Sequence, residues 1–340
     1  MTRSVEIVWA PHAAPHRHLL QGGVTAHCER TDVLGTSISV AGMGSVDYDE
    51  FGLFHENAQE FGLPFDRPPV VRREAVEVEP GRRLSSLVWG ETEPELVLLH
   101  GGAQNAHTWD TVALALRRPL VAVDLPGHGH SDNGRAGSLS PADSAADVAV
   151  TIRALAPRAR AVVGMSLGGL TAIALGRQDP ELVRRLVLVD ITPGVNAEKS
   201  APIIAFVQGP ASFTSFEEIL ARTIEFNPTR SESSLRRGVL HNAVQRADGT
   251  WVWRYRRFPS ATEYGLVNYP ALWDHLSGLT VPVMLVRGML AQSVVDDLDE
   301  AELLRHQPSA RVEHVTNAGH SVQGDAPLEL ARLIADFVRS

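Results

Sequence analysis

The sequence predicts an α/β fold in which a mostly parallel, twisted sheet is flanked by helices and carries a cap inserted after strand 6. Three observations lead to this prediction. Short runs rich in valine and leucine recur along the chain, and amphipathic helical stretches separate them. One interval between two runs is far too long for an ordinary connection. Continuous apolar runs are typical of parallel strands buried on both faces, and strand–helix alternation gives right-handed crossovers between them.

The N-terminal residues 1–66 are predicted to form an extension that is partly irregular. Residues 1–42 are rich in Gly, His, Ser and Thr and show no sustained helical or strand period. Such a segment buries too little apolar surface to offset its ordering entropy. Several histidines lie near Cys28, but their spacing matches no zinc-binding pattern, so we predict no metal there.

The core is predicted to comprise residues 67–192 and 271–340. Its strand candidates are Leu96–Leu99, Leu120–Val123, Ala161–Val163, Leu186–Val189, Val281–Val286 and Arg311–Thr316. Helices are predicted at Asp143–Leu155 and Leu328–Val338, where apolar residues recur at three- and four-residue intervals. This alternation supports a single α/β sheet.

Residues 193–270 are predicted to form the cap (lid) domain, because they separate two core strands. They contain a helical pattern at Phe216–Phe226. Asp248–Gly249 is a turn signal, and the aromatic residues that alternate after it predict a hairpin.

A G-x-S-x-G motif, Gly164-Met165-Ser166-Leu167-Gly168, follows one strand candidate and precedes a helical pattern. In this context the motif predicts a sharp strand-to-helix turn that lifts the serine hydroxyl clear of the backbone. The helix N-terminus beside the serine favours a developing negative charge. Ser166 is therefore the predicted nucleophile.

Three further motifs follow other strand candidates. His100-Gly101-Gly102-Ala103 lies upstream of the serine, and Asn317-Ala318-Gly319-His320-Ser321 follows the last candidate. Asp124-Leu-Pro-Gly-His-Gly-His-Ser131-Asp132 follows another, and we expect it to shape the loop beneath the serine. Neither His128 nor His130 is expected to be catalytic.

From about Glu74 to its C-terminus, the chain resembles the α/β-hydrolase fold superfamily, in particular its serine esterase-like branch with a cap domain. The resemblance implies that His320 is the general base and that the Ala103 and Leu167 amides form the oxyanion hole. Serine at position 166 argues against the haloalkane dehalogenases and epoxide hydrolases of this fold, which use aspartate there.

The acid of the catalytic triad is the least regular part of the resemblance. Many family members carry it after the seventh strand, where this chain has Ala291. Asp190, after the sixth strand as in some esterases, is therefore the preferred acid. Asp296 and Asp297 are the alternatives, although their place at the start of a helix suits a structural role.

These roles predict a serine hydrolase that cleaves a carboxylic ester, lactone or thioester of a small, fairly apolar substrate through an acyl-enzyme on Ser166. The alternatives are a carbon–carbon bond hydrolase or acyltransferase of the same fold, or a non-catalytic small-molecule receptor. The residues predicted to line the substrate pocket are Gly102, His107, Trp109, Met165, Trp251 and Trp253.

No metal or organic cofactor is expected, and a small-molecule substrate is the only predicted partner. The formal net charge of −9 argues against nucleic-acid binding. No apolar run approaches the roughly 20 residues that span a bilayer, so no membrane partner is expected. The N-terminus lacks a secretory signal pattern and Cys28 is the single cysteine, which together predict a cytoplasmic protein. Nothing in the sequence indicates the oligomeric state.

Overall fold

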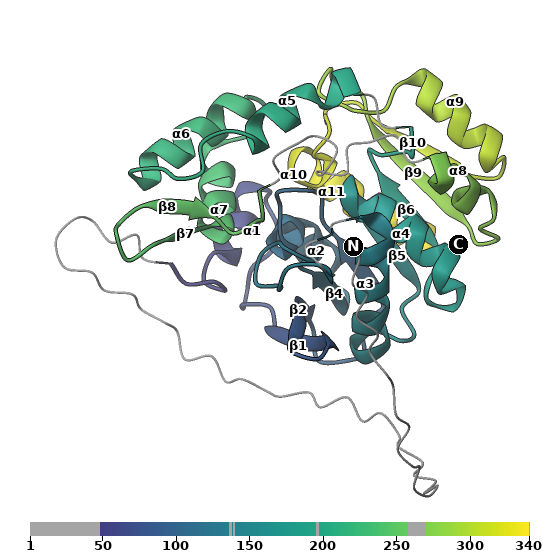
Figure 1. Cartoon of the computed structure of the whole chain (residues 1–340), viewed down its shortest axis with the longest axis horizontal. Helices are drawn as coiled ribbons and strands as arrows, with labels where there is room; N and C mark the ends of the chain where they lie inside the picture. Colours follow the sequence, from purple (N-terminus) through teal and green to yellow (C-terminus); the bar gives the residue numbers. More distant parts are fainter. Residues whose placement is uncertain (1–47, 136–137, 139, 195–196, 258–269, 340) are drawn as a thin grey trace, which may run out of the picture.

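The structure, a computed structural model, describes residues 48–339 apart from 136–137, 139, 195–196 and 258–269. The strands of its main sheet are β1 (Val71–Glu79), β2 (Arg82–Trp89), β3 (Leu96–Leu99), β4 (Leu120–Val123), β5 (Ala161–Met165), β6 (Leu186–Val189), β9 (Val283–Gly288) and β10 (Arg311–Val315). Within the described residues they pair in the order β1-β2-β4-β3-β5-β6-β9-β10 (Figure 1). The strand β2 pairs antiparallel with both β1 and β4, and the other neighbouring pairs of this sheet are parallel. The predicted α/β fold with a mostly parallel sheet is therefore confirmed.

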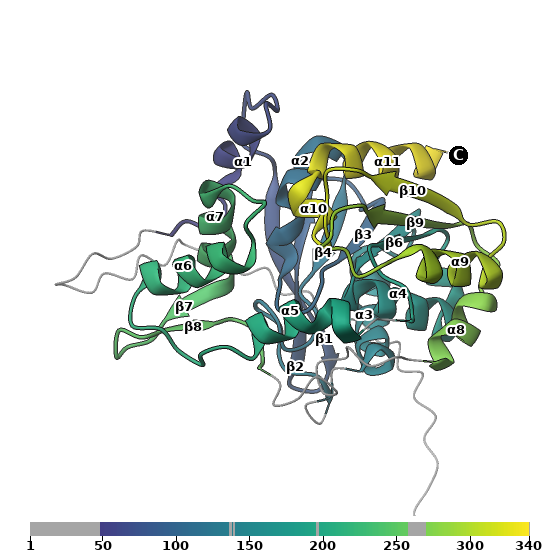
Figure 2. The ribbon, with the colours of Figure 1, turned by 90° about the horizontal axis from the view of Figure 1, so that it is seen from above.

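Helices cover both faces of this sheet. Those of the core are α1 (Phe54–Glu60), η1 (Ala106–Trp109), α2 (Asp110–Leu116), α3 (Pro141–Leu155), α4 (Leu167–Gln178), η3 (Pro180–Leu182), α8 (Pro270–Ser277), α9 (Asp297–His306), α10 (Val322–Asp325) and α11 (Pro327–Arg339). Figure 2 shows α3, α4 and α8 on one face, and α2 and α11 on the other. Alternate residues of β3 enter the two apolar clusters, Val97 and Leu99 in one and Leu96 and Leu98 in the other. This two-sided burial explains why the strands are continuous apolar runs.

The chain between β6 and α8 forms a separate group of elements: α5 (Ala197–Val207), α6 (Phe216–Phe226), α7 (Glu232–Asn242), β7 (Ala243–Gln245) and β8 (Trp251–Trp253). In Figure 1 they lie above and to the left of the blue strands. The helix α6 and the antiparallel β7–β8 hairpin are where the sequence predicted them. Gly249 in the hairpin turn has φ 87°, a conformation that favours glycine. The cap boundaries at 193 and 270 stay a prediction.

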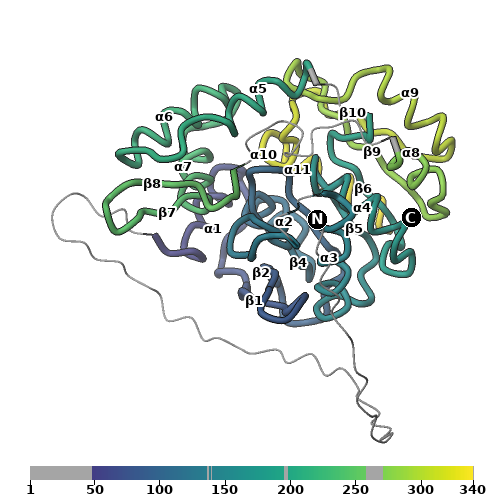
Figure 3. The backbone as a smooth tube through the Cα atoms, in the orientation of Figure 1, coloured from purple at the N-terminus to yellow at the C-terminus, as the bar shows by residue number. Residues whose placement is uncertain are grey.

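The segment 48–66 is folded onto the core. Its helix α1 buries Phe54, whose ring lies 4.8 Å from that of Trp89 between centroids. Figure 3 shows this purple segment beside the green α7. Residues 1–47, with their histidines and Cys28, lie outside the described residues.

Candidate active site

Ser166 occupies the tight turn between β5 and α4 with φ 49° and ψ −119°. The turn depends on the flanking glycines. A Cβ at Gly168 would overlap the carbonyl oxygens of Leu99 and His100, and a Cβ at Gly164 would overlap the backbone of Gly168. The predicted strand–turn–helix geometry around Ser166 is therefore present.

Backbone strain is concentrated around this turn. Among the described residues, only four non-glycine residues have positive φ, and three of them are Ala103 (59°), Ser166 (49°) and Asp190 (48°). Each follows or lies close to the end of a neighbouring parallel strand. Such strain persists only where the surrounding structure over-determines it, and it clusters at functional sites.

His320 and Asp190 are in direct contact, although 130 residues separate them. His320 donates from Nδ1 to Oδ2 of Asp190 at 2.9 Å, which leaves Nε2 as the basic nitrogen of the neutral ring. Both Ser166 and His320 line the same cavity. The three residues predicted as nucleophile, base and acid thus lie at one site.

Asp190 is fully buried, and its carboxylate is satisfied by the loop after β9. Oδ1 accepts hydrogen bonds from the Gly288 amide (2.9 Å) and the Ser293 hydroxyl (2.6 Å), and Oδ2 accepts one from the Val294 amide (3.0 Å). This is the loop that has Ala291 where many relatives carry the acid. It supplies hydrogen-bond donors to Asp190, the candidate acid after the adjacent strand β6, and Ser293 was not among the predicted site residues.

The alternative acids are engaged elsewhere. Asp296 is the N-cap of α9, where its Oδ1 accepts from the amides of Leu298 and Asp299. It also pairs with Lys199 at 2.6 Å, and this contact lowers the pKa of Asp296 to about 2. The Asp297 side chain is 93% exposed and pairs with Arg287. The structure brings neither carboxylate to His320.

The site opens into a cavity of about 390 Å³. Four of the residues predicted to line it do so: Gly102, His107, Met165 and Trp253. The prediction is wrong for the other two. Trp109 has no exposed surface and belongs to the apolar cluster under η1 and α2, and Trp251 packs against Phe216. Both indoles fill cores, as large buried aromatic side chains usually do.

The structure contradicts one of the two predicted oxyanion donors, Ala103. The Ala103 amide donates to Nε2 of His128 at 3.1 Å, so it is already engaged. Nδ1 of His128 donates to the Pro126 carbonyl, and burial lowers the pKa of His128 to about 3, so Nε2 is an acceptor. The amide of Gly102 makes no hydrogen bond with the described residues. Leu167, the first residue of α4, has an amide without an intrahelical acceptor.

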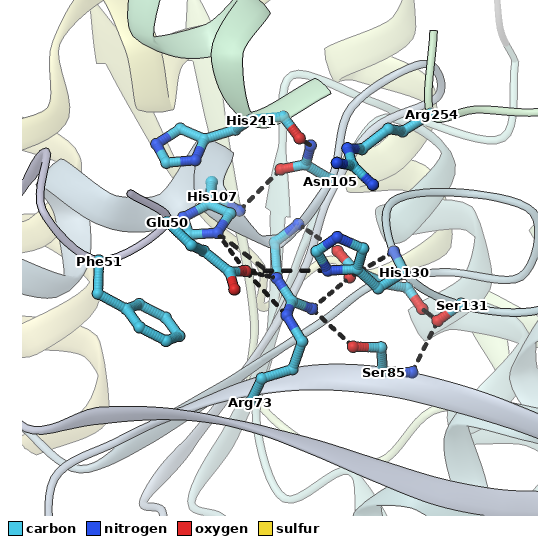
Figure 4. A network of polar contacts seen from close by, with 12 residues as sticks. Glu50, Phe51, Arg73, Ser85, Asn105, His107, His130, Ser131, His241 and Arg254 are labelled. Carbon is cyan, nitrogen blue, oxygen red and sulfur yellow. Dashed lines mark hydrogen bonds and ion pairs between the residues drawn. The ribbon is translucent and has the colours of Figure 1, made fainter. Parts of the chain in front are cut away.

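A buried ionic network supports the loop that carries Gly102 and Ala103. Asp124 accepts from the amides of Ala106 (2.8 Å) and His130 (3.0 Å) and pairs with Arg73 of β1 at 2.8 Å. Figure 4 shows Arg73 also reaching Glu50, from the N-terminal segment. The motif from Asp124 to Asp132 therefore has the structural role expected of it.

One group of described residues has the composition of a metal site. The ligand atoms of His107, Asp110 and His241, all buried, lie within 4.8 Å of one another. However, the two imidazole rings stack with centroids 3.8 Å apart and planes 8° from parallel. Their in-plane lone pairs therefore do not converge on one point, as metal coordination requires. Nδ1 of His107 lies 2.9 Å from Asp110, and Nδ1 of His241 lies 2.9 Å from the hydroxyl of Tyr48. The arrangement fits an ion-paired stack rather than a ligand set.

Comparison with known proteins places the chain in the alpha/beta hydrolase family. The model of the alpha/beta hydrolase family matches residues 96–333. Esterase Rv0045c of Mycobacterium tuberculosis is 44% identical over 293 residues, which are 84% of this chain and 94% of that protein. The sn-1-specific diacylglycerol lipase ABHD11 of Xenopus laevis is 31% identical over 261 residues, 73% of this chain and 80% of the lipase.

A solved structure of the M. tuberculosis esterase Rv0045c is also similar. It matches with a TM-score of 0.76 and 42% identity, over 87% of this chain and all of that one. Separately, none of the helices in the described part of the chain is long and apolar enough to cross a bilayer.

Proposed function

We propose that this chain, which belongs to the alpha/beta hydrolase family and is an ester hydrolase, works through an acyl-enzyme on Ser166. The observation that carries the proposal is the contact of His320 with the buried Asp190, beside a strained serine that lines the same cavity. This combination matches a nucleophile, a base and the group that orients the base.

The steps follow from these positions. His320 removes the proton from Oγ of Ser166 as the oxygen attacks the carbonyl carbon, and Asp190 stabilises the imidazolium that forms. His320 then protonates the leaving oxygen, or sulfur in a thioester, and the acyl group stays on Ser166. A water that loses a proton to His320 attacks the acyl carbon, the acid is released, and Ser166 regains its proton.

The oxyanion of each tetrahedral intermediate is held by the amides of Gly102 and Leu167. This assignment replaces Ala103 with Gly102, because His128 already accepts a hydrogen bond from the Ala103 amide. One such donor contributes about 3 kcal/mol to lowering the barrier. His128 acts as a positioning residue that holds the loop.

The substrate proposed is a small carboxylic ester, lactone or thioester whose body is mostly apolar. The apolar part of the cavity wall includes Ile203, Phe206, Val207, Phe226 and Trp253. Such walls bury a ligand while a few polar groups orient it. Hydrolysis by this route needs no metal or organic cofactor, and a cytoplasmic location remains part of the proposal.

The test is hydrolysis of p-nitrophenyl esters of increasing acyl length. Ser166→Ala should abolish turnover, and Asp190→Asn should lower kcat by roughly 10⁴-fold, because the imidazole loses its orienting acceptor. Asp297→Asn, a matched change at an exposed carboxylate, should leave kcat within about twofold of wild type. Turnover that survives Ser166→Ala, or that depends on Asp297 rather than Asp190, would contradict the proposal.

A further inference from the structure

We propose that Arg230 binds a carboxylate group of the substrate, so that the ester cleaved at Ser166 carries a second, ionised acid. This inference deepens the proposed function and rests on it. It adds one charged group to the mostly apolar substrate proposed above, and it rests on the turn between α6 and α7.

Arg230 lines the same cavity as Ser166 and His320. Its guanidinium makes one hydrogen bond with the described residues, from Nη2 to the Ser234 hydroxyl at 2.6 Å. Nε is buried without an acceptor, and Nη1 has none among the described residues. No carboxylate of the described residues lies within 4.0 Å of the guanidinium nitrogens. An arginine held in a partly buried site without a carboxylate partner is unusual, because a desolvated charge is unfavourable unless it is paired.

The other lysine and arginine side chains of the described cavity wall are neutralised by carboxylates. Lys199 lies 2.6 Å from Asp296. Arg237, one turn into α7, pairs with Glu60 and lies 3.6 Å from Glu56. Arg230 is therefore the cavity cation with the greatest unused capacity for an anion.

The guanidinium lies beside α10, the short helix that follows His320. It packs against the backbone of Gly324 in α10, four residues after His320. A Cβ at Gly324 would lie 2.8 Å from Cζ and 3.0 Å from Nη1 of Arg230. Glycine at this position thus leaves the space that Arg230 occupies. An anion bound at Nη1 would lie beside the turn that presents His320.

The chemistry favours a single carboxylate. Guanidinium presents parallel N–H donors that match the two oxygens of a carboxylate. Asp325 and Glu60 are close enough to act electrostatically on Arg230. The net positive potential is therefore small and suits a monoanion better than a phosphate dianion. The mostly apolar wall of the cavity would hold the chain between the carboxylate and the ester.

The experiment compares matched ester pairs that differ in one charge. In the first series the charge is on the acyl side: mono-p-nitrophenyl esters of six- to eight-carbon dicarboxylic acids are compared with the same esters whose free carboxylate is replaced by a carboxamide. In the second series the charge is on the leaving group: the butyrate ester of 4-hydroxybenzoate is compared with the butyrate ester of 4-hydroxybenzamide. The quantity measured is the ratio of kcat/KM for carboxylate over carboxamide. The proteins are wild type, Arg230→Gln, Arg230→Lys and Arg236→Gln, a charge-matched control that lies outside the cavity wall.

Wild type should prefer the carboxylate in at least one series. Arg230→Gln should lower that ratio by about 10- to 100-fold, the effect of losing one charge-assisted hydrogen bond, while carboxamide turnover stays within about threefold. Arg230→Lys should retain part of the preference, and Arg236→Gln all of it. A wild type without preference in either series, or a preference that persists in Arg230→Gln, would overturn the inference.

Two further readouts separate the possible failures. If Arg230→Gln does not fold, the inference is tested by comparing how strongly adipate and adipamide inhibit the wild-type enzyme. Adipate should be the stronger inhibitor, and equal inhibition by the two compounds would overturn the inference. Neutral-ester turnover that survives Ser166→Ala would instead overturn the proposed function. A neutral-ester activity lost in Ser166→Ala but indifferent to Arg230 would leave that function standing and remove the carboxylate site.

Discussion

At the scale of single residues, two neighbouring amides in one loop differ by their partners. The Ala103 amide is bound to His128, whereas the Gly102 amide makes no hydrogen bond with the described residues. In a crystal structure of the enzyme phosphonylated on Ser166, we expect the phosphonyl oxygen within about 3.1 Å of the nitrogens of Gly102 and Leu167. The Ala103 amide should stay on His128. An Ala103 amide that had turned to the phosphonyl oxygen would restore the assignment made from the sequence.

The stacked histidines predict opposite effects of pH on stability. Although burial opposes its charge, Asp110 and Glu50 raise the pKa of His107 to about 9. In the unfolded chain the value is about 6.5. The stabilisation from protonated His107 is therefore complete below about pH 6.5 and is lost as the pH rises towards 9.

For His241 the sign is reversed, because burial and the nearby His107 and Arg73 hold its pKa well below the ordinary value. The folded protein keeps this ring neutral while the unfolded chain takes up a proton, so stability falls as the pH drops below about 6.5. Urea unfolding from pH 5 to 10 checks both signs. His107→Asn should flatten the alkaline decline and His241→Asn the acid one. An unchanged slope in either variant would contradict the corresponding assignment.

At the scale of elements, two glycines in helices predict opposite results for the same substitution. Gly238 lies inside α7, and a Cβ there would meet nothing within 4 Å. Gly238→Ala should therefore raise the free energy of unfolding by about 0.5 to 1 kcal/mol, because alanine loses less backbone entropy in a helix. Gly168→Ala, at the start of α4, should lower the free energy of unfolding by about 2 kcal/mol or more. The new methyl group would overlap the carbonyl oxygens of Leu99 and His100. Thermal unfolding of both variants checks the contrast, which fails if the two shifts have the same sign.

The regular elements of the core could be predicted from the sequence because their signals are local. The apolar run Leu186–Val189 is the whole of β6, and Phe216–Phe226 is the whole of α6. The strands β1 and β2, at one side of the sheet, escaped prediction. They are antiparallel, and the exposed and buried residues of β1 largely alternate, so no continuous apolar run marks that strand.

The candidate site was predictable only where a motif fixes a role. Ser166 and His320 follow strands in a recognisable order, and Asp190 follows from the missing acid at Ala291. Two features depend on residues far apart in sequence: the hydrogen bond from Ser293 to Asp190, and the lack of a carboxylate partner for Arg230 among the described residues. Such contacts have no local period or spacing to reveal them.

At the scale of the whole molecule, the segment 48–60 joins α7 to the core. The Tyr48 hydroxyl lies 2.9 Å from Nδ1 of His241, and Glu60 pairs with Arg237, so this segment contacts α7 at more than one point. On its other side, Phe54 packs against Trp89 of β2. Figures 1 and 2 both show α1 beside α7. The cavity wall that α7 contributes is therefore held in part by the N-terminal segment.

This arrangement predicts that Phe54→Ala destabilises the whole molecule and not only its N-terminal edge. Phe54 is 2% exposed, and truncating a buried phenylalanine costs about 3 to 5 kcal/mol. Val70→Ala is the control, because Val70 is 53% exposed and its truncation should change stability by less than about 0.5 kcal/mol. We expect Phe54→Ala to lower the Tm by several degrees in a single cooperative transition, followed by near-ultraviolet circular dichroism and by loss of ester hydrolysis. If activity were lost well below the temperature of the spectroscopic transition, α7 would be detaching from an intact core. An unchanged Tm would show that the packing of Phe54 against Trp89 contributes little to the stability of the fold.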